Sequence, residues 1–319
     1  MGNIFCRLPG RVDGGTPIFL CAHLDTVPPT GPLEPFIEDG VVRNAGGTIL
    51  GADDKAAVVV MLEAARRIVT EGRDHAGVEL LFTPKEEVGL LGAYAFDHTR
   101  FEARLGYVFD QAAPIGEVIL GAPYQKSIMA RFRGRAAHAG MYPEDGRSAI
   151  LAASRAIADM RLGRIDGQSS ANVGLIDGGS ARNIVPEWCS FEAEVRSRDA
   201  RTLATLLQEM IDAIGFAAST SDCTVAIETV ENYRGYTFRE DEPAVRLAID
   251  ALSAAGYTPT TALSGGGADA NVFNERGLPC VNLANGMTDI HTPDERISVA
   301  DLEGMVEVTL ALVDAARAA

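Results

Sequence analysis

Four short apolar segments along the chain each lead into residues that can do chemistry. Residues 18–22 lead into His23, 78–83 into Glu86, 105–109 into Asp110 and 280–284, after a short loop, into His291. Runs of this length that contain β-branched or aromatic residues are typical of buried strands. Residues 56–69, between the first two runs, have the length and composition of a helix.

The alternation of strand, helix and strand favours an α/β sheet that is covered by helices. In such sheets, ligands bind beyond the carboxyl ends of the strands. All four runs carry their acids or histidines at that end. The sequence therefore predicts a functional site at one edge of the sheet.

The middle of the chain follows a different pattern. Strands are predicted at 125–133, 172–177, 188–196 and 224–230, and helices at 147–160 and 203–214. This order is that of a ferredoxin-like α+β unit, which we place at 122–230. A helix at 243–255 and a Gly-rich stretch at 264–267 then return to the first sheet. The predicted fold class is α/β: a mixed sheet flanked by helices, in a discontinuous domain at 1–121 and 231–319, with the α+β domain inserted.

Composition and charge narrow the classes of protein. Of 319 residues, 47% are hydrophobic and 23% charged, which is typical of a globular chain. The 28 basic and 44 acidic residues give a net charge of −16, which argues against nucleic acid as a partner. No apolar run approaches the ~20 residues of a membrane helix, and residues 1–10 do not resemble a signal peptide. We therefore expect a soluble protein of the cytoplasm, without a membrane partner.

The five cysteines also bear on the compartment. Their number is odd, no two form a CxxC pair, and their neighbours are largely apolar. We expect reduced thiols in the core of a protein from a reducing compartment.

His23 and Asp25 occupy alternating positions that point to the same side of an extended segment. An imidazole that binds a metal commonly donates its second N–H to a carboxylate, although an exposed loop pair would have the same pattern. Asp53 and Asp54 precede the predicted helix and could cap it. A cap accounts for one of them and leaves the other free to bridge two cations.

Glu86 and Glu87 are adjacent carboxylates, which repel each other unless a positive charge or solvent neutralises them. One can act as a metal ligand while its neighbour acts as a general base towards water. Asp110 and His291 are ordinary by themselves, and an Asp after a strand also suits a turn. Together the candidate ligands offer nitrogen and oxygen without thiolate, which suits two Zn²⁺, Co²⁺ or Mn²⁺ ions that share a carboxylate: His23, Asp53, Glu87, Asp110 and His291.

A series of motifs resembles that of the M20 metallopeptidases, in order and over nearly the whole chain: His23-Leu-Asp25-Thr-Val, Leu50-Gly-Ala-Asp53-Asp-Lys55, Thr83-Pro-Lys-Glu86-Glu87-Val-Gly89, Val108-Phe-Asp110 and Ala136-Ala-His138-Ala-Gly140. The Leu-Gly-Ala-Asp-Asp-Lys form is similar to the peptidase T (tripeptide aminopeptidase) branch. The resemblance implies a zinc-peptidase-like catalytic domain with an inserted lid and dimerisation domain.

The resemblance also implies roles for single residues. His23 and Asp110 would bind one zinc, Glu87 and His291 the other, and Asp53 would bridge them. Asp25 would orient His23, and Glu86 would be the general base.

Further roles fall on the inserted domain and on the Gly-rich loop. His138 would reach the active site of the partner subunit in a homodimer and stabilise the oxyanion. Asn183 and Arg196 would hold the substrate, and the backbone at Gly266 and Gly267 would contact it. Without the resemblance, other interpretations are open: His138 could be a turn residue, Arg196 a surface charge and the Gly run a flexible turn.

The activity that the resemblance implies is di-zinc hydrolysis of short peptides, with release of the N-terminal residue of tripeptides. The alternative in the same family is an amidohydrolase or carboxypeptidase that acts on N-acyl amino acids or dipeptides. A catalytically silent protein that binds metal or peptide is the alternative from another class. Members of the family usually carry a further helix and strand before the segment that corresponds to 1–15, so we expect a truncated start, a misassigned initiator or an unusual member of the family.

Overall fold

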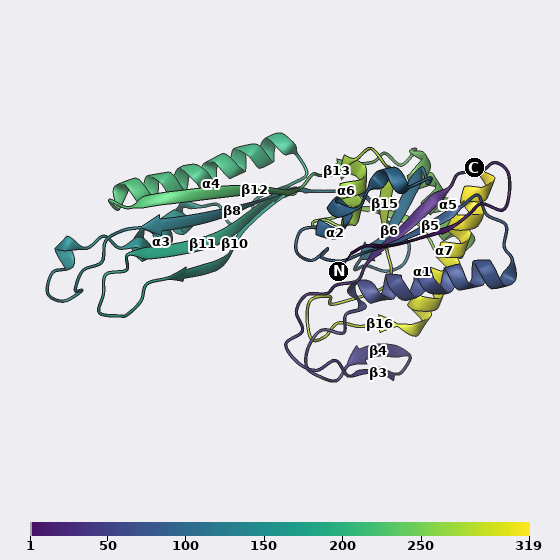
Figure 1. The fold of residues 1–319 in the computed structure, drawn as a ribbon, viewed down its shortest axis with the longest axis horizontal. Coiled ribbons are helices and arrows are strands. Elements are labelled where there is room, and N and C mark those ends of the chain that lie inside the picture. The colour runs from purple at the N-terminus through teal and green to yellow at the C-terminus, as the bar shows by residue number, and fades with distance from the viewer. Residues whose placement is uncertain (1) are drawn as a thin grey trace. The chain divides into compact units, whose positions relative to one another are not determined.

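A computed structural model describes residues 2–319, and the chain within it forms two compact units. Unit 1 runs up to Ala122 and resumes at Tyr236, and unit 2 is the intervening segment Pro123–Gly235. The sequence placed the limits of the inserted part at 122 and 230. Figure 1 shows the chain coloured from the N-terminus to the C-terminus.

Unit 1 is built on an eight-stranded mixed sheet. Its strands lie in the order β1-β5-β2-β6-β15-β7-β13, with β14 paired to β7, and the central four, β5, β2, β6 and β15, are parallel. Their bounds are β1 Ile4–Leu8, β2 Ile18–His23, β5 Val78–Thr83, β6 Leu105–Gln111, β7 Glu117–Ala122, β13 Tyr236–Thr237, β14 Thr260–Leu263 and β15 Cys280–Ala284. The mixed α/β fold predicted from the sequence is confirmed.

Helices cover both faces of this sheet. Three long ones share a hydrophobic core with the sheet: α1 Ala52–Glu71, α5 Pro243–Ala254 and α7 Val299–Ala318. Ile18 and Leu20 of β2 point into that core and are almost completely buried. Two shorter helices, α2 Leu91–Ala95 and α6 Asp269–Glu275, contact each other, and α6 also packs on β2, β6 and β15.

An aromatic cluster fills the space beneath α6. Phe19, which alternates with Ile18 and Leu20 along β2, lies 4.4 Å from Phe101 and 4.9 Å from Phe273 of α6, measured between ring centroids. The ring of Phe19 also lies over Gly106 of β6, where a Cβ atom would come within 1.9 Å of it. Only glycine leaves room for that ring. The alternation of Ile18, Phe19 and Leu20 therefore buries both faces of the strand, as expected of a central parallel strand.

A three-stranded sheet, in the order β16-β4-β3, lies apart from the main one. Its strands are β3 Pro35–Glu38, β4 Val41–Asn44 and β16 Ile297–Ser298. It was not predicted from the sequence, because the strands are short, and β3 is exposed while β4 is only half-buried. It connects the segment before α1 to the segment before α7.

Unit 2 has the predicted β-α-β-β-α-β order, with the two-residue strand β9 added after the first helix, around an antiparallel sheet, β12-β8-β11-β10-β9 (Figure 1). Its elements are β8 Tyr124–Arg133, α3 Ala149–Asp159, β9 Gly163–Arg164, β10 Ser169–Gly178, β11 Trp188–Ser197, α4 Ala200–Thr220 and β12 Thr224–Tyr233. Strand β12 continues beyond residue 230, where the prediction ended it. In this extension, Glu231 forms an ion pair with Lys126 of β8, at 3.4 Å.

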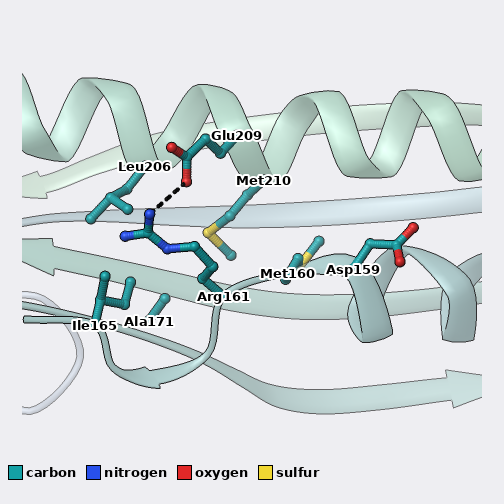
Figure 2. Close-up of a pocket in the computed structure, with 8 residues that line it drawn as sticks. All are labelled: Asp159, Met160, Arg161, Ile165, Ala171, Leu206, Glu209 and Met210. Atoms are coloured by element: carbon teal, nitrogen blue, oxygen red, sulfur yellow. Dashed lines mark ion pairs between the residues drawn. The ribbon is translucent and has the colours of Figure 1, made fainter.

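A pocket of about 200 Å³ lies in unit 2 beside α4 (Figure 2). Ala171 of β10 and Leu206 and Met210 of α4 form its apolar wall. Arg161 and Glu209 form an ion pair at its side, with 3.7 Å between Nη1 and Oε2.

The five cysteines are free thiols. Cys21, Cys189 and Cys280 are buried as expected, but Cys6 is exposed and Cys223 is half-buried, so the prediction of core positions is wrong for these two. Cys6 lies on β1, an edge strand whose residues are exposed or half-buried. Among residues 2–319, no helix combines the length and the apolar character that a membrane span requires.

Candidate functional site

The parallel strands of unit 1 gather the candidate ligands at one edge of the sheet. Strands β5, β2, β6 and β15 are neighbours in that order, so their carboxyl ends meet. His23 is the last residue of β2, and Glu86 and Glu87 follow β5. Asp110 lies inside β6, which continues to Gln111, and not in a turn after the strand.

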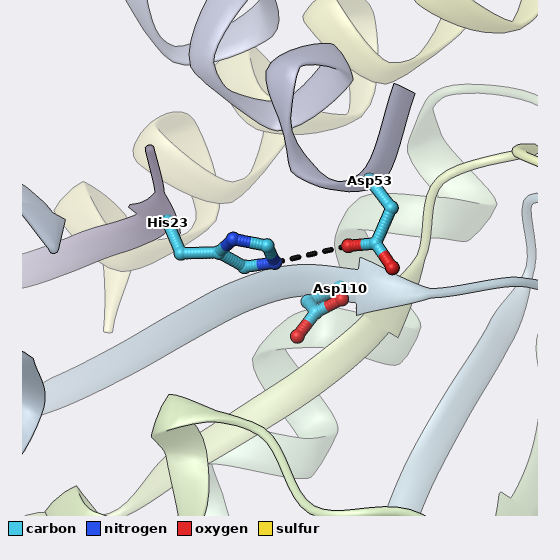
Figure 3. Close-up of side chains that lie close together, drawn as sticks. All are labelled: His23, Asp53 and Asp110. Atoms are coloured by element: carbon cyan, nitrogen blue, oxygen red, sulfur yellow. Dashed lines mark hydrogen bonds and ion pairs between the residues drawn. The ribbon is translucent and has the colours of Figure 1, made fainter. Parts of the chain in front are cut away.

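Asp53 comes to this edge from the start of α1. Its Oδ1 atom lies 2.9 Å from Nε2 of the buried His23. Figure 3 shows the imidazole of His23 pointing at the Asp53 carboxylate, with the Asp110 carboxylate facing the same space. His23, Asp53 and Asp110 each offer one ligand atom, and these three atoms lie within 4.8 Å of one another.

The second oxygen of Asp53 faces a different histidine. Its Oδ2 atom lies 3.1 Å from Nε2 of His291, and the same nitrogen lies 3.0 Å from Oε1 of Glu87. Asp53, Glu87 and His291 form a second group whose ligand atoms lie within 4.8 Å of one another. Asp53 therefore belongs to both groups and stands between them.

Asp25 connects His23 to the Glu pair. The Nδ1 atom of His23 lies 3.0 Å from the backbone oxygen of Asp25 and 3.7 Å from its carboxylate Oδ1. The carboxylate itself accepts hydrogen bonds from the backbone N–H of Glu86, at 3.0 Å, and of Glu87, at 3.3 Å. Asp25 thus contacts the imidazole of His23 and also fixes the loop that carries Glu86 and Glu87.

The pKa values of the site carboxylates are shifted in opposite directions. For Asp53, hydrogen bonds from His23 and His291 outweigh the effect of burial and hold the pKa below its ordinary range. Burial raises the pKa of Glu86 to about 8, and the charges of Asp269 and Glu87 add to that rise. Burial also raises the pKa of Asp110 well above its usual value. The hydrogen bond with Asp53 raises the pKa of His291 to about 9.

The expected helix cap is not made by Asp53 or Asp54. The N-cap residue of α1 is Gly51, no side chain of its own segment caps it, and the backbone at both aspartates is non-helical. Asp54 is fully buried, its Oδ2 atom accepts the N–H of His23 at 3.3 Å, and its Oδ1 atom has no partner. Both aspartates are turned away from capping, because their carboxylates face β2.

These residues fit a pair of divalent cations. Three carboxylates and two imidazoles supply only oxygen and nitrogen ligands, which suits Zn²⁺, Co²⁺ or Mn²⁺. The carboxylates of Asp53, Glu86 and Glu87 crowd into one largely desolvated space, where bound positive charge would offset their repulsion. A carboxylate with each oxygen turned to a different group is the arrangement that two-metal sites need.

Three of the predicted site residues lie in unit 2. His138 is exposed, and its Nδ1 atom accepts the backbone N–H groups of Gly140 and Met141 at 3.2 and 3.1 Å. The backbone oxygen of the exposed Asn183 accepts the N–H of Ala139 at 3.0 Å, so Asn183 lies beside the His138 turn. Arg196, on β11, pairs with Glu194 at 3.0 Å.

The predicted glycines of the substrate loop belong to unit 1. Gly266 and Gly267 are half-buried and lie between β14 and α6. The N–H of Gly266 donates to Oγ of Ser264 at 3.0 Å.

Three buried polar residues that support the site were not predicted from the sequence. Asn282 accepts the N–H of Asp110 and donates to its backbone oxygen, at 2.9 and 2.8 Å. Asp269 accepts the hydroxyl of Thr83 at 2.5 Å. Glu295 accepts the N–H of Asp53 at 2.9 Å. Of the three, only Glu295 had a local signal, since it lies four positions after His291 in a polar loop.

Comparisons with known proteins agree with this geometry. Residues 19–315 match the model of Peptidase family M20/M25/M40. The chain is similar to the aminopeptidase PepT from Bacillus cereus (39% identity, TM-score 0.86) and to a tripeptidase from Staphylococcus aureus (34%, TM-score 0.92), each match covering 99% of this chain and 84% of the other. Peptidase T of Pectobacterium carotovorum is 26% identical over 88% of this chain and 69% of its own length.

Proposed function

The chain belongs to peptidase family M20/M25/M40 and is a peptidase, and from that premise we propose that it is a metal-dependent aminopeptidase that releases the N-terminal residue of short peptides, above all tripeptides. The observation that carries the proposal is the position of Asp53, whose two oxygens face His23 and His291. The similar proteins named as an aminopeptidase and a tripeptidase support this choice of substrate.

The proposed metal ligands are His23 and Asp110 for one ion, Glu87 and His291 for the other, and Asp53 for both. Two divalent cations, zinc in the first place and otherwise cobalt or manganese, would supply Lewis acidity to the scissile carbonyl and acidify the attacking water. Asp25 orients His23 and the loop of the two glutamates through the contacts described above.

Glu86 is the proposed general base. It takes a proton from the attacking water and gives it to the leaving amine. Burial raises the pKa of Glu86 and so strengthens its hold on a proton. Cations bound beside it would lower that pKa, so that the carboxylate would be ionised before it takes the proton from water.

The remaining roles rest on the family resemblance. We propose that the protein works in the cytoplasm as a homodimer formed through unit 2. His138 then stabilises the oxyanion in the site of the partner subunit. Arg196, with Asn183, holds the substrate carboxylate or backbone, since a guanidinium matches a carboxylate with two hydrogen bonds. Gly266 and Gly267 present backbone to the peptide. The free thiols of all five cysteines agree with a reducing compartment.

Hydrolysis of a plain tripeptide and of its N-acetyl counterpart tests the proposed activity. Purified protein loaded with Zn²⁺ is incubated with each peptide, and a chelated sample serves as the control. We expect cleavage of the free-amine tripeptide alone, and its loss on chelation.

Other outcomes of that experiment would change the assignment. Cleavage of the acetylated peptide instead would support the amidohydrolase or carboxypeptidase alternative. If neither peptide is cut by protein that contains metal, the proposed activity is wrong, and a protein that only binds metal or peptide becomes the better description.

A further inference from the structure

Glu295 is a buried carboxylate outside the proposed ligand set. Its side chain is 2% exposed, and it comes from the loop between β15 and β16. Oε2 accepts the backbone N–H of Leu50 at 2.7 Å and of Gly51 at 2.8 Å, and Oε1 accepts the N–H of Asp53 at 2.9 Å. Both oxygens are therefore engaged by the turn that ends at Asp53.

These contacts complete the start of α1. The first N–H groups of a helix have no partner within the helix, and a side-chain acceptor usually satisfies them. Gly51, at the N-cap position, has a φ of 80° and no side chain to offer. Glu295 supplies the acceptor for the N–H groups of Leu50, Gly51 and Asp53 from the far end of the chain. The carboxylates of Asp53 and Asp54 are thereby left free for other contacts.

The same loop carries His291, and its backbone is closed on itself. Thr288 and Arg296 exchange two backbone hydrogen bonds, at 3.0 and 3.1 Å, across the base of the loop. Inside it, the N–H of Glu295 donates to the backbone oxygen of Thr292, whose hydroxyl donates to the backbone oxygen of Asp289. A closed loop of this kind fixes Glu295 and His291 relative to each other.

We propose that Glu295 is a positioning residue that sets the distance between Asp53 and His291, and through it the affinity of the metal ion that these two residues share. The carboxylate holds the backbone of Asp53 on one side, and the closed loop holds His291 on the other. The distance of 3.1 Å between Asp53 Oδ2 and His291 Nε2 depends on this connection. The inference rests on the proposed function, because it takes the two residues to be metal ligands.

Glu79 offers a matched control. It is also 2% exposed, and it also accepts backbone N–H groups, those of Glu102 and Ala103, together with the guanidinium of Arg7. It lies on β5, about 13 Å before the carboxyl end of that strand at 3.3 Å per residue. A substitution that removes the charge of Glu79 therefore has the same local effect as one at Glu295, but away from the site.

The experiment compares the parent protein with Glu295→Gln and Glu79→Gln. In Glu295→Gln, the new side-chain amide places an NH₂ group against backbone N–H groups, so that part of the turn loses its acceptor. Metal-free samples are titrated with Co²⁺, and the binding constants are taken from calorimetry and from the visible spectrum of the bound ion. Melting temperatures are measured on the same metal-free samples.

We expect the parent to bind two ions. Glu295→Gln should weaken the binding of one ion by about 10–100-fold, which is typical when a residue that supports a ligand is changed, and should alter the Co²⁺ spectrum. Glu79→Gln should lower the melting temperature and leave both affinities within about threefold of the parent, since it supports no ligand.

Three results would overturn the inference. Parent-like affinities in Glu295→Gln would show that the contact does not position the ligands, and an equal loss in Glu79→Gln would show a general effect of destabilisation. A parent that binds no ion would overturn the proposed metal site as well, so the two failures are distinguishable. If Glu295→Gln does not fold, Glu295→Asp replaces it, since it keeps the charge and shortens the reach, and unchanged affinity would again overturn the inference.

Discussion

Asp53 and Glu86 are neighbouring carboxylates of the site with opposite properties. Asp53 faces two histidines, and their hydrogen bonds keep its pKa low, so that it stays ionised, as the proposed ligand role requires. For Glu86, burial outweighs the opposing charge of His23 and raises the pKa to about 8. Pairs of titratable groups whose environments separate their pKa values are typical of acid–base sites.

Glu86→Gln tests the proposed base directly. The substitution keeps the size of the side chain and removes its ability to accept a proton. We expect kcat/KM for a tripeptide to fall by about 10²–10⁴-fold, the usual contribution of a general base, while the metal content of the protein stays that of the parent. Initial rates and elemental analysis of the same samples measure both. An unchanged rate would mean that Glu86 is not the base.

The same variant also tests the sharing of sites between subunits. His138→Ala is the second chain, and each variant is first shown to be inactive alone. In a randomly mixed dimer population, half of the dimers contain one chain of each kind, and each of these has one intact site if His138 acts across the interface. We expect about a quarter of the parent activity after subunit exchange. No recovery in a mixture shown to contain mixed dimers would contradict a shared site.

At the scale of elements, two apolar residues of α4 differ in burial and should therefore contribute differently to the free energy of unfolding. Ile214 on its inner side is completely buried in the core of unit 2, whereas Phe216, two positions along, is 65% exposed. Neighbouring helix positions point in different directions, so one side chain packs on the sheet and the other faces away. Hydrophobicity by itself does not distinguish the two residues.

Ile214→Ala should therefore destabilise unit 2 by about 2–5 kcal/mol, through lost burial and the cavity that remains. Phe216→Ala is the matched control, with an expected change within about 0.5 kcal/mol. Trp188 of β11 is the one tryptophan of the sequence and lies in unit 2, so its fluorescence during urea unfolding reports on that unit. Equal effects of the two substitutions would contradict the assigned packing.

At the scale of the whole molecule, unit 2 is an insertion whose two ends leave unit 1 side by side. Ala122 at the end of β7 is paired with Tyr236 of β13 in an antiparallel ladder. Directly paired residues of such a ladder have Cα atoms about 4.5–5.5 Å apart. All strands of the main sheet therefore belong to unit 1, and none comes from unit 2. The proposed metal ligands also all belong to unit 1.

Replacement of 123–235 by a short Gly–Ser linker tests this division. We expect the shortened chain to fold and to bind divalent ions with the affinity of the parent, because no proposed ligand is removed. Hydrolysis of tripeptides should be lost, since His138 and Arg196 are absent. Circular dichroism, metal titration and rate measurements check the three points. Retained hydrolysis would contradict the roles proposed for these two residues.

Much of the fold could be predicted from local pattern. The apolar runs at 18–22, 78–83 and 280–284 correspond closely to β2, β5 and β15, because a strand buried on both faces needs a continuous apolar segment. The order of elements in unit 2 followed from the alternation of strand and helix patterns. The short strands β3, β4 and β16 were missed, since their residues carry no clear periodicity and gain their order from pairing with distant segments.

The sequence by itself determined the family, the fold class and the residue types at the ends of the parallel strands, since these depend on the kind and order of residues along the chain. Only the tertiary structure decided which groups the carboxylates face. Asp53 faces His23 and His291, and Asp54 is not a cap, because Glu295 satisfies the start of α1 from a distant loop. Contacts between residues more than 200 positions apart depend on the packing of the whole domain, and no local pattern encodes them.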